Sequence, residues 1–389
     1  MKRYKVAVIT THIAPAIGYG GPAVSIASLI TAWGQQPNKI LLCSSDASER
    51  SSLKPSDIIV GQNTEIHLYH SYWFKRWGFG FGAITTLISA CWHAQTVYIN
   101  GIATWPTTLA AIFCCALRCR FVIAARGGLM PEHLAFIRRY QRHKWWFYRL
   151  LTLPTLRCAT IIHCTSLLEA KAIQPVLGKN SVTLIIPNGV NVKAIPPQDI
   201  STDKQTVLCY VGRIAREKGI NRFIQLWLKY RNSPDRFFIA GSGAQNDPYY
   251  QEFQKIAAHS QGAIIYYGYL ATTKLQQLIL ASHFLVLPSG LDGGGIRENF
   301  GNAVAEALSL SRPVIVTKGL AWDHLESIGA GLVFEPHEES IQTVIQHIQQ
   351  MNEADRRKMA IAARQYAETH LDIQTLASTL WSIIIGKQN

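Results

Sequence analysis

Two glutamates, Glu298 and Glu306, have the spacing with the clearest chemical meaning in this sequence. They flank the segment 299–305, and the motif Pro288-Ser289-Gly290 and a glycine run at 293–295 precede them. This pattern predicts a strand that ends before the loop and a helix that begins near Gly301. A helix start offers free N–H groups and a positive dipole end, which suit phosphate or sugar oxygens. Two carboxylates also accept hydrogen bonds from vicinal hydroxyls.

A plainer interpretation of each glutamate stays open. Glu298 could only favour a helix N-terminus, and Glu306 could be a solvated helix residue. Either glutamate taken alone would favour this plainer interpretation, so the chemical hypothesis depends on both occurring around one helix start.

A basic loop, 211–220, follows another expected strand. Arg213 presents paired donors that fit a phosphate, and Lys218 presents a point charge. A diphosphate would connect this loop to the helix start near Gly301, although a solvated basic loop is the alternative for this segment alone. The glycine-rich segment 18–22 lacks the full GxGxxG spacing, so it supports a dinucleotide site poorly.

The elements that must position these residues alternate between short β-rich runs and helical patterns, which indicates an α/β chain with parallel sheets. A strand is expected at 6–10, followed by a helix at 23–33. The other expected strands are 39–43, 65–69, 96–100, 120–125, 160–165, 182–186, 206–212, 236–240, 263–267, 283–287 and 313–317. A helix is expected from Asn221, and the tail from Asp355 is expected to be helical.

The polar, Pro-containing stretch 194–205 is interpreted as a linker between two domains. We expect a first Rossmann-like domain at 1–195 and a second at 205–369, with a C-terminal helix at about 370–389 that packs back onto the first domain. Two doubly wound domains in tandem would face each other across a cleft at the carboxyl ends of both sheets.

The composition excludes several classes of protein. The chain has 389 residues, of which 48% are hydrophobic and 16% charged, so it is not a disordered chain. Residues 1–195 contain 20 Lys and Arg against 6 Asp and Glu, whereas residues 196–389 contain 18 of each. The whole net charge of +14 therefore belongs to the first half, which should face an anionic partner.

The cysteines and the N-terminus indicate a cytoplasmic protein. All eight cysteines lie between Cys43 and Cys209 without a CxxC pair, which makes zinc ligation unfavourable and suggests reduced thiols. The N-terminal apolar run is too short for a secretion signal. The most apolar stretches, 79–92 and 106–117, are too short to span a membrane.

Taken together, these segments resemble the retaining glycosyltransferases of the GT4 family, which have two Rossmann-like domains in the arrangement called GT-B. The resemblance covers nearly the whole chain, and Glu298-x7-Glu306 is its most specific element. The supporting elements are Gly212-Arg213, Lys218-Gly219, Pro187-Asn188-Gly189-Val190, Gly20-Gly21, Thr165-Ser166 and Glu169-Ala170.

The resemblance implies a role for each donor-side residue. Arg213 and Lys218 would neutralise the diphosphate of a nucleotide sugar, as part of the catalytic set with Glu298. Glu306 would hold the ribose hydroxyls, and Glu298 a hydroxyl of the sugar. The remaining donor-binding residues would be Asn299, Phe300, Gly301, Asn302 and Tyr269.

The resemblance also implies the reaction. We expect a metal-independent transferase of hexosyltransferase type that keeps the anomeric configuration and needs no cofactor. The donor would be a nucleotide-diphosphate sugar, with UDP- and GDP-sugars expected first. The acceptor would be a glycan or a lipid-linked molecule in the biosynthesis of a cell-surface polysaccharide or glycolipid.

On the acceptor side, the sequence departs from the family. Many relatives carry a His after a middle strand of the first domain, where this chain has Ile99-Asn100-Gly101 and 124–128. We therefore assign no catalytic His and expect Gly20, Gly21 and Arg126 to contact the sugar or acceptor. His133 and His163 are expected to be ordinary polar or packed residues, and Asn191 replaces the usual Asp.

The segment 133–151 is expected to form one helix. At 100° per residue, one face should pack on the domain and consists of Phe136, Ile137, Tyr140, Phe147, Leu150 and Leu151. The other face gathers Arg138, Arg139, Arg142 and Arg149, with Trp145 and Trp146 beside them. With the segment 72–77, this pattern suggests docking on an anionic membrane, peripherally on the inner face of the cell membrane. A solvated basic face with a soluble acceptor is the alternative.

Two other functions stay open. A nucleotide-sugar 2-epimerase shares the two-domain architecture, although the Glu298 to Glu306 motif argues against it. The basic half could also belong to an anion- or nucleic-acid-binding protein without activity. No zinc finger, RNP-like strand pattern or basic low-complexity tail supports that, so we expect no nucleic-acid partner.

Overall fold

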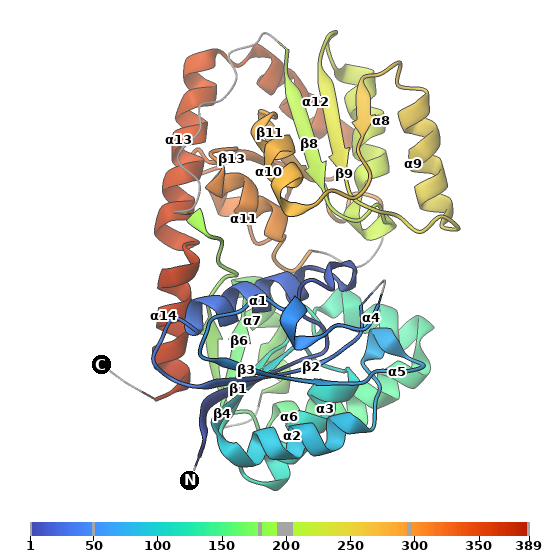
Figure 1. The fold of residues 1–389 in the computed structure, drawn as a ribbon. Helices are drawn as coiled ribbons and strands as arrows, with labels where there is room; N and C mark the ends of the chain where they lie inside the picture. Colours follow the sequence, from blue (N-terminus) through green and yellow to red (C-terminus); the bar gives the residue numbers. More distant parts are fainter. Residues whose placement is uncertain (1, 49–50, 178–180, 193–204, 294–297, 387–389) are drawn as a thin grey trace. The chain divides into compact units, whose positions relative to one another are not determined.

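The computed structural model describes residues 2–48, 51–177, 181–192, 205–293 and 298–386, and it divides the chain into two units (Figure 1). Unit 1 comprises Met1–Gly189 and Ile373–Asn389, and unit 2 comprises Val190–Asp372. The expected linker 194–205 lies outside the described residues except for Gln205.

Unit 1 contains a fully parallel seven-stranded sheet in the order β3-β2-β1-β4-β5-β6-β7. The strands are β1 Tyr4–Thr10, β2 Ile40–Ser45, β3 Thr64–Tyr69, β4 Ala94–Asn100, β5 Phe121–Ala124, β6 Ile161–Cys164 and β7 Val182–Ile185. From β1 the chain adds β2 and β3 on one side, and it then crosses over to add β4 to β7 on the other side. The strand order therefore reverses between β1 and β4, as in a doubly wound sheet.

Helices cover both faces of this sheet. They are α1 Gly21–Trp33, α2 Gly82–His93, α3 Trp105–Ala116, α4 Pro131–Tyr140, α5 Arg142–Phe147, α6 Leu153–Leu156, α7 Leu167–Ile173 and α14 Ile373–Ile384. Strand β1 shows why the strands are apolar throughout. Val6 and Val8 face the core with α1 and α14, whereas Ala7 and Ile9 face the core with α2 and α3.

The C-terminal helix α14 belongs to unit 1 although it is the last element of the chain. It lies beside α1 (Figure 1). Trp33 Nε1 donates a hydrogen bond to the carbonyl oxygen of Ala377 at 2.8 Å, and the Trp33 and Trp381 rings are 5.5 Å apart. The hydroxyl of Thr96, on β4, donates to the carbonyl oxygen of Ile384. Unit 1 thus buries the apolar face of α14.

Unit 2 contains a fully parallel six-stranded sheet in the order β10-β9-β8-β11-β12-β13. The strands are β8 Val207–Val211, β9 Arg236–Ala240, β10 Ile264–Tyr266, β11 Phe284–Leu287, β12 Val314–Thr317 and β13 Gly331–Phe334. The helices are α8 Ile220–Tyr230, α9 Pro248–Ala258, α10 Thr272–Leu280, α11 Asn302–Ser309, α12 Glu338–Gln350 and α13 Glu353–His370.

The two faces of the unit 2 sheet bury separate cores. Leu208 and Tyr210 of β8 pack in the core that includes α8, α9 and α12. Cys209, between them, faces the core that includes α10, α11 and α13. The order of strands reverses between β8 and β11, so the loops that follow these two strands meet at the edge where doubly wound sheets bind ligands.

The expected strands are all present, within two residues at each end. The structure adds β13, a four-residue edge strand that the sequence analysis did not predict. The helical tail is two helices rather than one: α13 ends at His370, and α14 begins at Ile373. Between them, Asp372 forms a parallel bridge with Val190.

The division between the units falls at residue 189 rather than near 195. Val190 N–H donates to the carbonyl oxygen of Leu371 at 2.8 Å, and Arg364 donates to the carbonyl oxygen of Val192, so this segment is bonded within unit 2. The last residue of the first segment of unit 1, Gly189, packs so closely on Ile373 that a Cβ at this glycine would lie 2.6 Å from the Ile373 Cα.

The prediction of one continuous helix over 133–151 is wrong. Helix α4 ends at Tyr140, and Gln141 leaves the helical region with φ −132° and ψ 61°. A π-helical turn, Tyr148–Thr152, then follows α5. A break and a wider turn rotate the side chains away from a 100° period, and Tyr140 and Leu150 are therefore each 64% exposed.

The other residues of the predicted packing face differ in how far they are buried. Ile137 is buried, Phe136 and Phe147 are partly buried, and Leu151 is exposed. The prediction that Leu150, Leu151 and Tyr140 pack on the domain is therefore wrong as well.

We predict that Trp381→Ala lowers the free energy of unfolding by about 3–5 kcal/mol, because it removes a large buried side chain beside Trp33. Chemical denaturation followed by circular dichroism measures this effect. Trp92→Ala is the matched control, since Trp92 is 63% exposed on α2, and we expect a change within about 0.5 kcal/mol. Equal losses in the two variants would contradict the packing of α14.

Candidate functional site

The loops after β8 and β11 are in backbone contact. Gly290 N–H donates to the carbonyl oxygen of Glu217 at 3.0 Å. Gly219 has φ +67°, and a Cβ at this position would lie 2.1 Å from the Pro288 carbonyl oxygen. Only glycine allows both this backbone conformation and this close approach. Glycine is therefore required directly after Lys218. It lets the loop after β8 approach the loop after β11, where Glu298 lies.

Lys218 and Glu298 form an ion pair across these loops. Their side chains are only 18% and 17% exposed. A pair so withdrawn from water interacts more strongly than a surface pair, and removing one partner would leave the other charge uncompensated. The two most specific motifs of the sequence are thus joined by one interaction.

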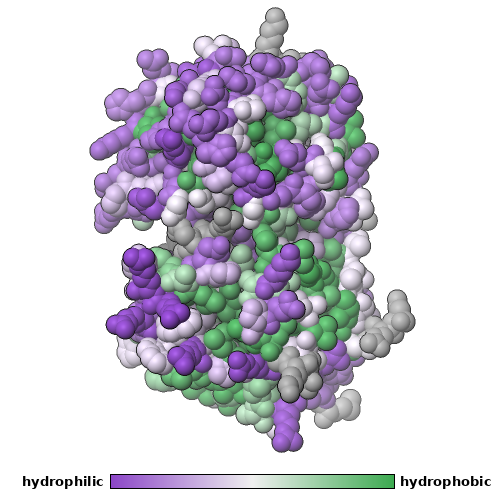
Figure 2. Space-filling view, turned by 180° about the vertical axis from the view of Figure 1, so that it is seen from behind, coloured by the Kyte–Doolittle hydropathy of each residue, from purple (hydrophilic) through white to green (hydrophobic). Residues whose placement is uncertain are grey.

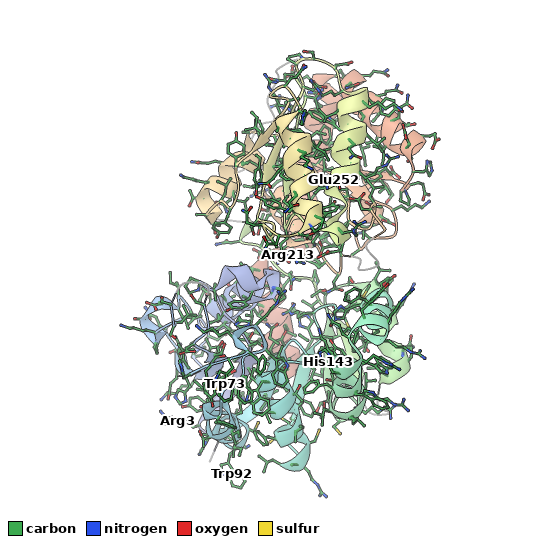
Figure 3. The ribbon with its side chains drawn as sticks, turned by 90° about the vertical axis from the view of Figure 1, so that its right-hand side faces the viewer. Arg3, Trp73, Trp92, His143, Arg213 and Glu252 are labelled. Atoms are coloured by element: carbon green, nitrogen blue, oxygen red, sulfur yellow. The ribbon has the colours of Figure 1, made fainter. Side chains whose placement is uncertain are left out.

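Arg213 lies in the same loop after β8 as Lys218, at the end of unit 2 where Figure 3 labels it. Its guanidinium donates to Glu217 at 2.9 Å, and its side chain is 57% exposed. The hydroxyl of buried Tyr210 donates to the Arg213 carbonyl oxygen at 2.7 Å, which fixes the backbone while the side chain stays accessible. Burial raises the pKa of Tyr210 well above its usual value, so this hydroxyl remains a donor.

The helix α11 begins where the sequence predicts. Gly301 precedes it with φ +78°, and Trp322 Nε1 donates a hydrogen bond to the carbonyl oxygen of Phe300. The Phe300 and Trp322 rings are 4.8 Å apart and both are buried. The indole thus holds the segment that leads into the helix, whose first turn includes Asn302 and directs N–H groups toward the loop.

Glu306 lies in the second turn of α11. Burial raises the pKa of its carboxyl group to about 7. In the described part of the chain no hydrogen bond or ion pair engages this carboxylate. A carboxylate that is withdrawn from water and lacks a partner is typical of a site that a ligand completes.

Two further sheet-end loops, after β9 and β10, lie against the loop after β8. Gly241 N–H donates to the carbonyl oxygen of Gly268 at 2.8 Å, and a Cβ at Gly241 would lie 1.8 Å from the Gly212 carbonyl oxygen. Tyr269, the next residue after Gly268, is 57% exposed. Asn299 is half-buried between Glu298 and Phe300. Gly294 and Gly295 of the expected glycine run lie outside the described residues.

The sequence analysis missed two residues that hold the glycine loop. Asp292 accepts a hydrogen bond from the hydroxyl of Tyr249 at 2.5 Å, and Tyr249 is buried on α9. The Tyr249 hydroxyl oxygen also accepts a hydrogen bond from the N–H of Asn221, on α8, at 2.9 Å. No local pattern connects residues so far apart in the sequence, so only the fold reveals this anchor.

In unit 1, Arg126 lies after β5 with φ +52°. Its guanidinium donates to Asn100 Oδ1 at 2.7 Å, to Asn188 Oδ1 at 2.6 Å and to the Tyr98 hydroxyl at 3.3 Å. These bonds use three of its five N–H donors, which leaves two for another molecule. Arg126 therefore connects the ends of several strands.

The neighbouring histidine is a packed residue, as expected. His163 is buried, and its ring nitrogens lie 2.6 Å from the Tyr98 hydroxyl and 2.8 Å from the Ile186 carbonyl oxygen. Burial, together with the charge of Arg126, lowers the pKa of His163 to about 3. Burial and the charge of Lys144 lower the pKa of His133 to about 4. Both imidazoles are neutral at pH 7.

Glu169, from the motif Glu169-Ala170, binds the loops that follow β5 and β6. Glu169 is buried, and its carboxylate accepts hydrogen bonds from Gly127 N–H and from the N–H and hydroxyl of Thr165. Ser166 caps α7 by accepting from Glu169 N–H. These bonds fix the loop that carries Arg126.

Gly20 and Gly21 begin α1, and Gly20 has φ +108°. The sequence analysis did not single out the neighbouring pair His12 and Tyr19, whose rings stack at 3.6 Å with an interplanar angle of 6°. His12 follows β1, so this stacked pair stands at the carboxyl edge of the unit 1 sheet, beside the glycine loop.

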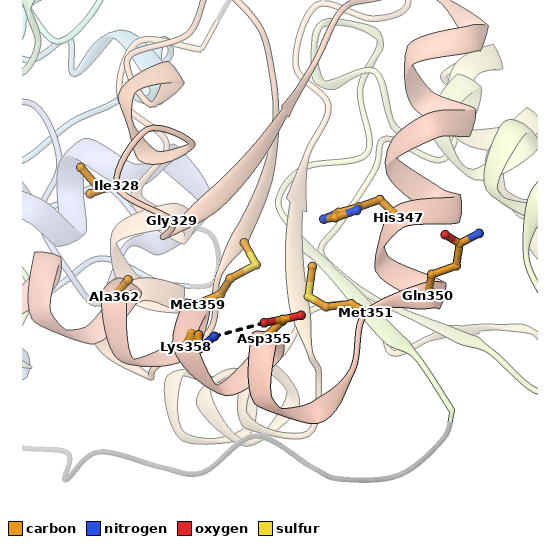
Figure 4. A pocket seen from close by; sticks show the side chains of 9 residues that line it. All are labelled: Ile328, Gly329, His347, Gln350, Met351, Asp355, Lys358, Met359 and Ala362. Carbon is orange, nitrogen blue, oxygen red and sulfur yellow. Dashed lines mark ion pairs between the residues drawn. The ribbon is translucent and has the colours of Figure 1, made fainter.

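A pocket of about 570 Å³ lies elsewhere in unit 2 (Figure 4). It is lined by Ile328, Gly329, His347, Gln350, Met351, Asp355, Lys358, Met359 and Ala362. Its only charged pair is Lys358 with Asp355, 3.5 Å apart. Gly329 precedes β13, so this pocket opens at the amino end of the sheet, and none of the expected site residues lines it.

Two other kinds of feature are absent from the residues that the structure describes. No group of three or more His, Cys, Asp or Glu side chains there is arranged to hold a metal ion. No helix in the same part of the chain is both long and apolar enough to cross a membrane.

A known family model matches the part of the chain that carries this site. Residues 192–367 match the model of the family described as glycosyl transferases group 1. Glycogen synthase from Leptospira biflexa is 27% identical over 135 residues, or 33% of this chain and 27% of the synthase. The chain thus aligns with about a quarter of the length of that curated relative.

Solved structures share the fold over nearly the whole chain. HepE from Anabaena, in complex with UDP and glucose, superposes with a TM-score of 0.75 at 16% identity, covering 98% of this chain and 100% of HepE. Sucrose-phosphate synthase from Thermosynechococcus elongatus has a TM-score of 0.73 at 16% identity, covering 99% and 100%. The family resemblance and the α/β fold class expected from the sequence are confirmed.

The raised pKa of Glu306 predicts a pH-dependent stability. A carboxyl group whose pKa is higher in the folded state than in the unfolded state destabilises the fold as pH rises from about 4.5 through 7. Glu306→Gln should therefore have a higher free energy of unfolding than the wild type at pH 8, by on the order of 1–3 kcal/mol. Its melting temperature should be higher at pH 8 and the same near pH 4.5. Thermal melts across this pH range measure the difference.

Glu353→Gln, the same substitution at an exposed position of unit 2, is the control and should show no such rise. A Glu306→Gln variant whose melting temperature differs from the wild type by the same amount at both pH values would contradict the half-buried, unpaired state of the carboxylate.

Proposed function

We propose that this chain, whose residues 192–367 are a glycosyl transferases group 1 domain, transfers a sugar from a nucleotide diphosphate to an acceptor hydroxyl. The observation that carries this proposal is the Lys218 to Glu298 ion pair beside the start of α11. It combines a cation for a diphosphate, a carboxylate for sugar hydroxyls and a helix dipole in one place.

In this proposal, Lys218 and the exposed guanidinium of Arg213 neutralise the leaving diphosphate. The bond between the anomeric carbon and the diphosphate oxygen breaks, and the electron pair leaves with the diphosphate. The two cations and the positive end of α11 stabilise that charge as it develops. Metal-independent transfer is part of the proposal because these groups supply the positive charge.

The ion pair also suggests how the donor enters. A diphosphate that binds Lys218 replaces Glu298 as its partner, and Glu298 is then available to accept a hydrogen bond from the sugar. The lysine thus exchanges one anionic partner for another, and a sugar hydroxyl replaces the lysine as the hydrogen-bond donor to Glu298.

Glu306 completes the donor site in this account by accepting hydrogen bonds from the two ribose hydroxyls. Its carboxylate has no partner among the described residues and has a raised pKa, so hydrogen-bond donors that favour its charged form would bind there. The amides near Phe300, Gly301 and Asn302 contact the sugar and phosphate, and Asn299 and Tyr269 border them.

We propose a UDP-sugar as the first donor to test, with GDP-sugars next. HepE, which shares the fold, is known in complexes with UDP and with UDP-glucose. The acceptor hydroxyl attacks from the face that the phosphate leaves, so that the anomeric configuration is retained. On the acceptor side, Gly20, Gly21 and the two unused N–H groups of Arg126 contact the acceptor or sugar.

The direct test is incubation of the protein with UDP- and GDP-sugars in EDTA, with product analysis by mass spectrometry and proton NMR. In the absence of an acceptor, we expect slow hydrolysis of one nucleotide sugar, in which water takes the place of the acceptor hydroxyl. The released sugar should at first have the anomeric configuration of the donor. Conversion of the sugar to its C2 epimer would instead indicate the epimerase alternative. No consumption and no binding of any nucleotide sugar would contradict the proposal.

We predict that Lys218→Ala weakens nucleoside diphosphate binding about 10- to 100-fold, because a charge-assisted contact to phosphate is lost. Isothermal titration calorimetry measures the dissociation constant. Lys229→Ala is the matched control, since Lys229 is an exposed lysine of the same unit that pairs with Glu338, and it should bind as the wild type does.

A second variant separates the two possible causes of that loss. Lys218→Met with Glu298→Gln removes both charges, so no lone buried carboxylate remains to repel the ligand. We expect binding to stay weak in this double variant. Recovery of wild-type affinity would mean that Lys218 only neutralises Glu298 and does not bind phosphate.

We further propose that the acceptor is lipid-linked and that unit 1 docks peripherally on an anionic membrane. Hydrophobic side chains cover much of unit 1 in the lower part of Figure 2, whereas hydrophilic side chains cover most of unit 2 in that view. Two surface clusters combine exposed aromatic and basic side chains. Cluster A consists of Trp73, Phe74, Lys75 and Arg76, and cluster B of Arg138, Arg139, Tyr140, Arg142, Trp146, Arg149 and Leu150.

Contacts between arginine side chains and aromatic rings support the proposed docking on a membrane. Arg149 lies 5.6 Å from the Trp146 ring, and Arg139 lies 5.4 Å from the Tyr140 ring. The Trp77 ring, which follows cluster A, packs on Phe147 of α5 at 5.5 Å and connects the two clusters. An interface of aromatic rings and arginines fits the headgroup layer of an anionic bilayer.

Vesicle flotation tests the docking proposal. The protein should float with vesicles that contain about 30% phosphatidylglycerol at low salt and remain behind at 0.5 M NaCl, since salt screens the attraction. Trp73→Ser with Trp146→Ser should reduce flotation several-fold. Trp92→Ser, at an exposed tryptophan outside both clusters (Figure 3), should leave flotation unchanged. Equal recovery with neutral and anionic vesicles would contradict the electrostatic part of the proposal.

A further inference from the structure

Five of the eight cysteines gather at one end of unit 1. Cys91 is near the end of α2, Cys114 and Cys115 are in the last turn of α3, Cys119 follows α3, and Cys158 follows α6. None of them takes part in the proposed transfer, so this cluster needs its own explanation.

Three of these thiols are in direct contact. The sulfur atoms of Cys91 and Cys114 are 3.5 Å apart, and Cys119 Sγ lies 3.3 Å from the Cys91 carbonyl oxygen. Cys119 N–H donates to the Cys114 carbonyl oxygen at 2.9 Å, and the Cys114 and Cys119 side chains influence each other's pKa. Cys114 is therefore the centre of the group, with one thiol on either side.

The three positions differ in exposure. Cys91 and Cys114 are fully buried, whereas Cys119 is half-buried at the surface of the loop before β5. A small oxidant that arrives from solvent thus meets Cys119 first. Lys2 stands beside the group, and its Nζ donates to the Cys91 carbonyl oxygen at 3.4 Å.

The environment of Cys119 favours its thiolate. The hydrogen bond from Cys114 is the main cause that lowers the pKa of Cys119 to about 6; burial opposes this effect and the charge of Lys2 adds to it. Burial instead raises the pKa of Cys115 and of Cys209 to about 12. Since the thiolate is the nucleophilic form, Cys119 is set apart from the other cysteines.

We propose that Cys119 is a peroxide-reactive cysteine and that Cys114 is its resolving partner. The Cys119 thiolate attacks hydrogen peroxide, a sulfur–oxygen bond forms, the oxygen–oxygen bond breaks and hydroxide leaves. The Cys114 sulfur then attacks the sulfenic sulfur. A disulfide forms, the sulfur–oxygen bond breaks, and the oxygen leaves as water with the Cys114 proton. Peroxide is the two-electron oxidant of the sequence.

This proposal is independent of the proposed transferase function. It requires only the geometry at the end of α3, and the bond would fix the loop before β5 to that helix. Reduction by a dithiol would restore both thiols by exchange.

The first experiment measures alkylation of each cysteine by iodoacetamide in the wild-type protein between pH 5 and 9, with peptide mass spectrometry. The groups that face Cys119 are Cys114, Cys91 and Lys2, so its rate should rise with a midpoint near pH 6. At pH 7, Cys119 should react about three- to tenfold faster than the exposed Cys158, after allowance for the lower nucleophilicity of a low-pKa thiolate. Faster labelling of Cys158 at every pH would overturn the proposal.

The second experiment identifies the disulfide. The wild-type protein treated with hydrogen peroxide at low molar excess should yield a Cys114–Cys119 peptide pair, and dithiothreitol should remove it. Cys119→Ser should abolish both the pair and the peroxide-dependent loss of thiols. Cys114→Ala keeps a small apolar side chain in the core. It should slow the oxidation of Cys119, because the interaction that lowers its pKa is lost, and it should leave a sulfenic acid on Cys119 that dimedone traps.

Cys158→Ser is the matched control and should behave as the wild-type protein does. A bond between Cys91 and Cys114 in place of the expected pair, or undiminished thiol loss in Cys119→Ser, would show that Cys119 is not the reactive cysteine.

Discussion

The ion pair between Lys218 and Glu298 is the interaction on which the candidate site depends. Two charges that are less than a fifth exposed must neutralise each other, so the loops after β8 and β11 must stay in register. Gly219 makes this possible, because a side chain there would strike the Pro288 carbonyl oxygen. The parallel sheet places both loops at one edge, and the glycine lets them close into one site.

The two units differ in how they hold the cationic side chain at their candidate sites. Unit 2 pairs its inward-facing lysine with a carboxylate, whereas in unit 1 neutral groups of Asn100, Asn188 and Tyr98 hold Arg126. The uncompensated charge of Arg126 adds to burial in keeping His163 neutral. In the proposed function, unit 1 thus offers positive charge to an anionic partner, and an incoming anion would replace Glu298 as the partner of the unit 2 lysine.

Sequence patterns predicted both sheets, except for the edge strand β13, and the start of α11, because strand periodicity and the glycine before a helix are local properties. The hydrogen bond of Asp292 to Tyr249 depends on residues from separate elements, so no spacing reveals it. The helix expected at 133–151 failed for a related reason: nothing in the composition of the segment marks the break at Gln141 or the wider turn after Phe147. Packing against residues distant in the sequence determines where such a helix breaks, and the hydrophobic periodicity of the segment carries no information about that packing.

The most direct test of the central claim is calorimetric titration of UDP, GDP, ADP and TDP into the protein, first with EDTA and then with Mg²⁺. The account predicts that one nucleoside diphosphate binds with the same affinity in both conditions. It also predicts that this binding is lost in a variant that combines Lys218→Ala with Glu306→Ala. Binding that requires Mg²⁺, or that survives in the double variant, would contradict the proposal that the Lys218 site holds the diphosphate.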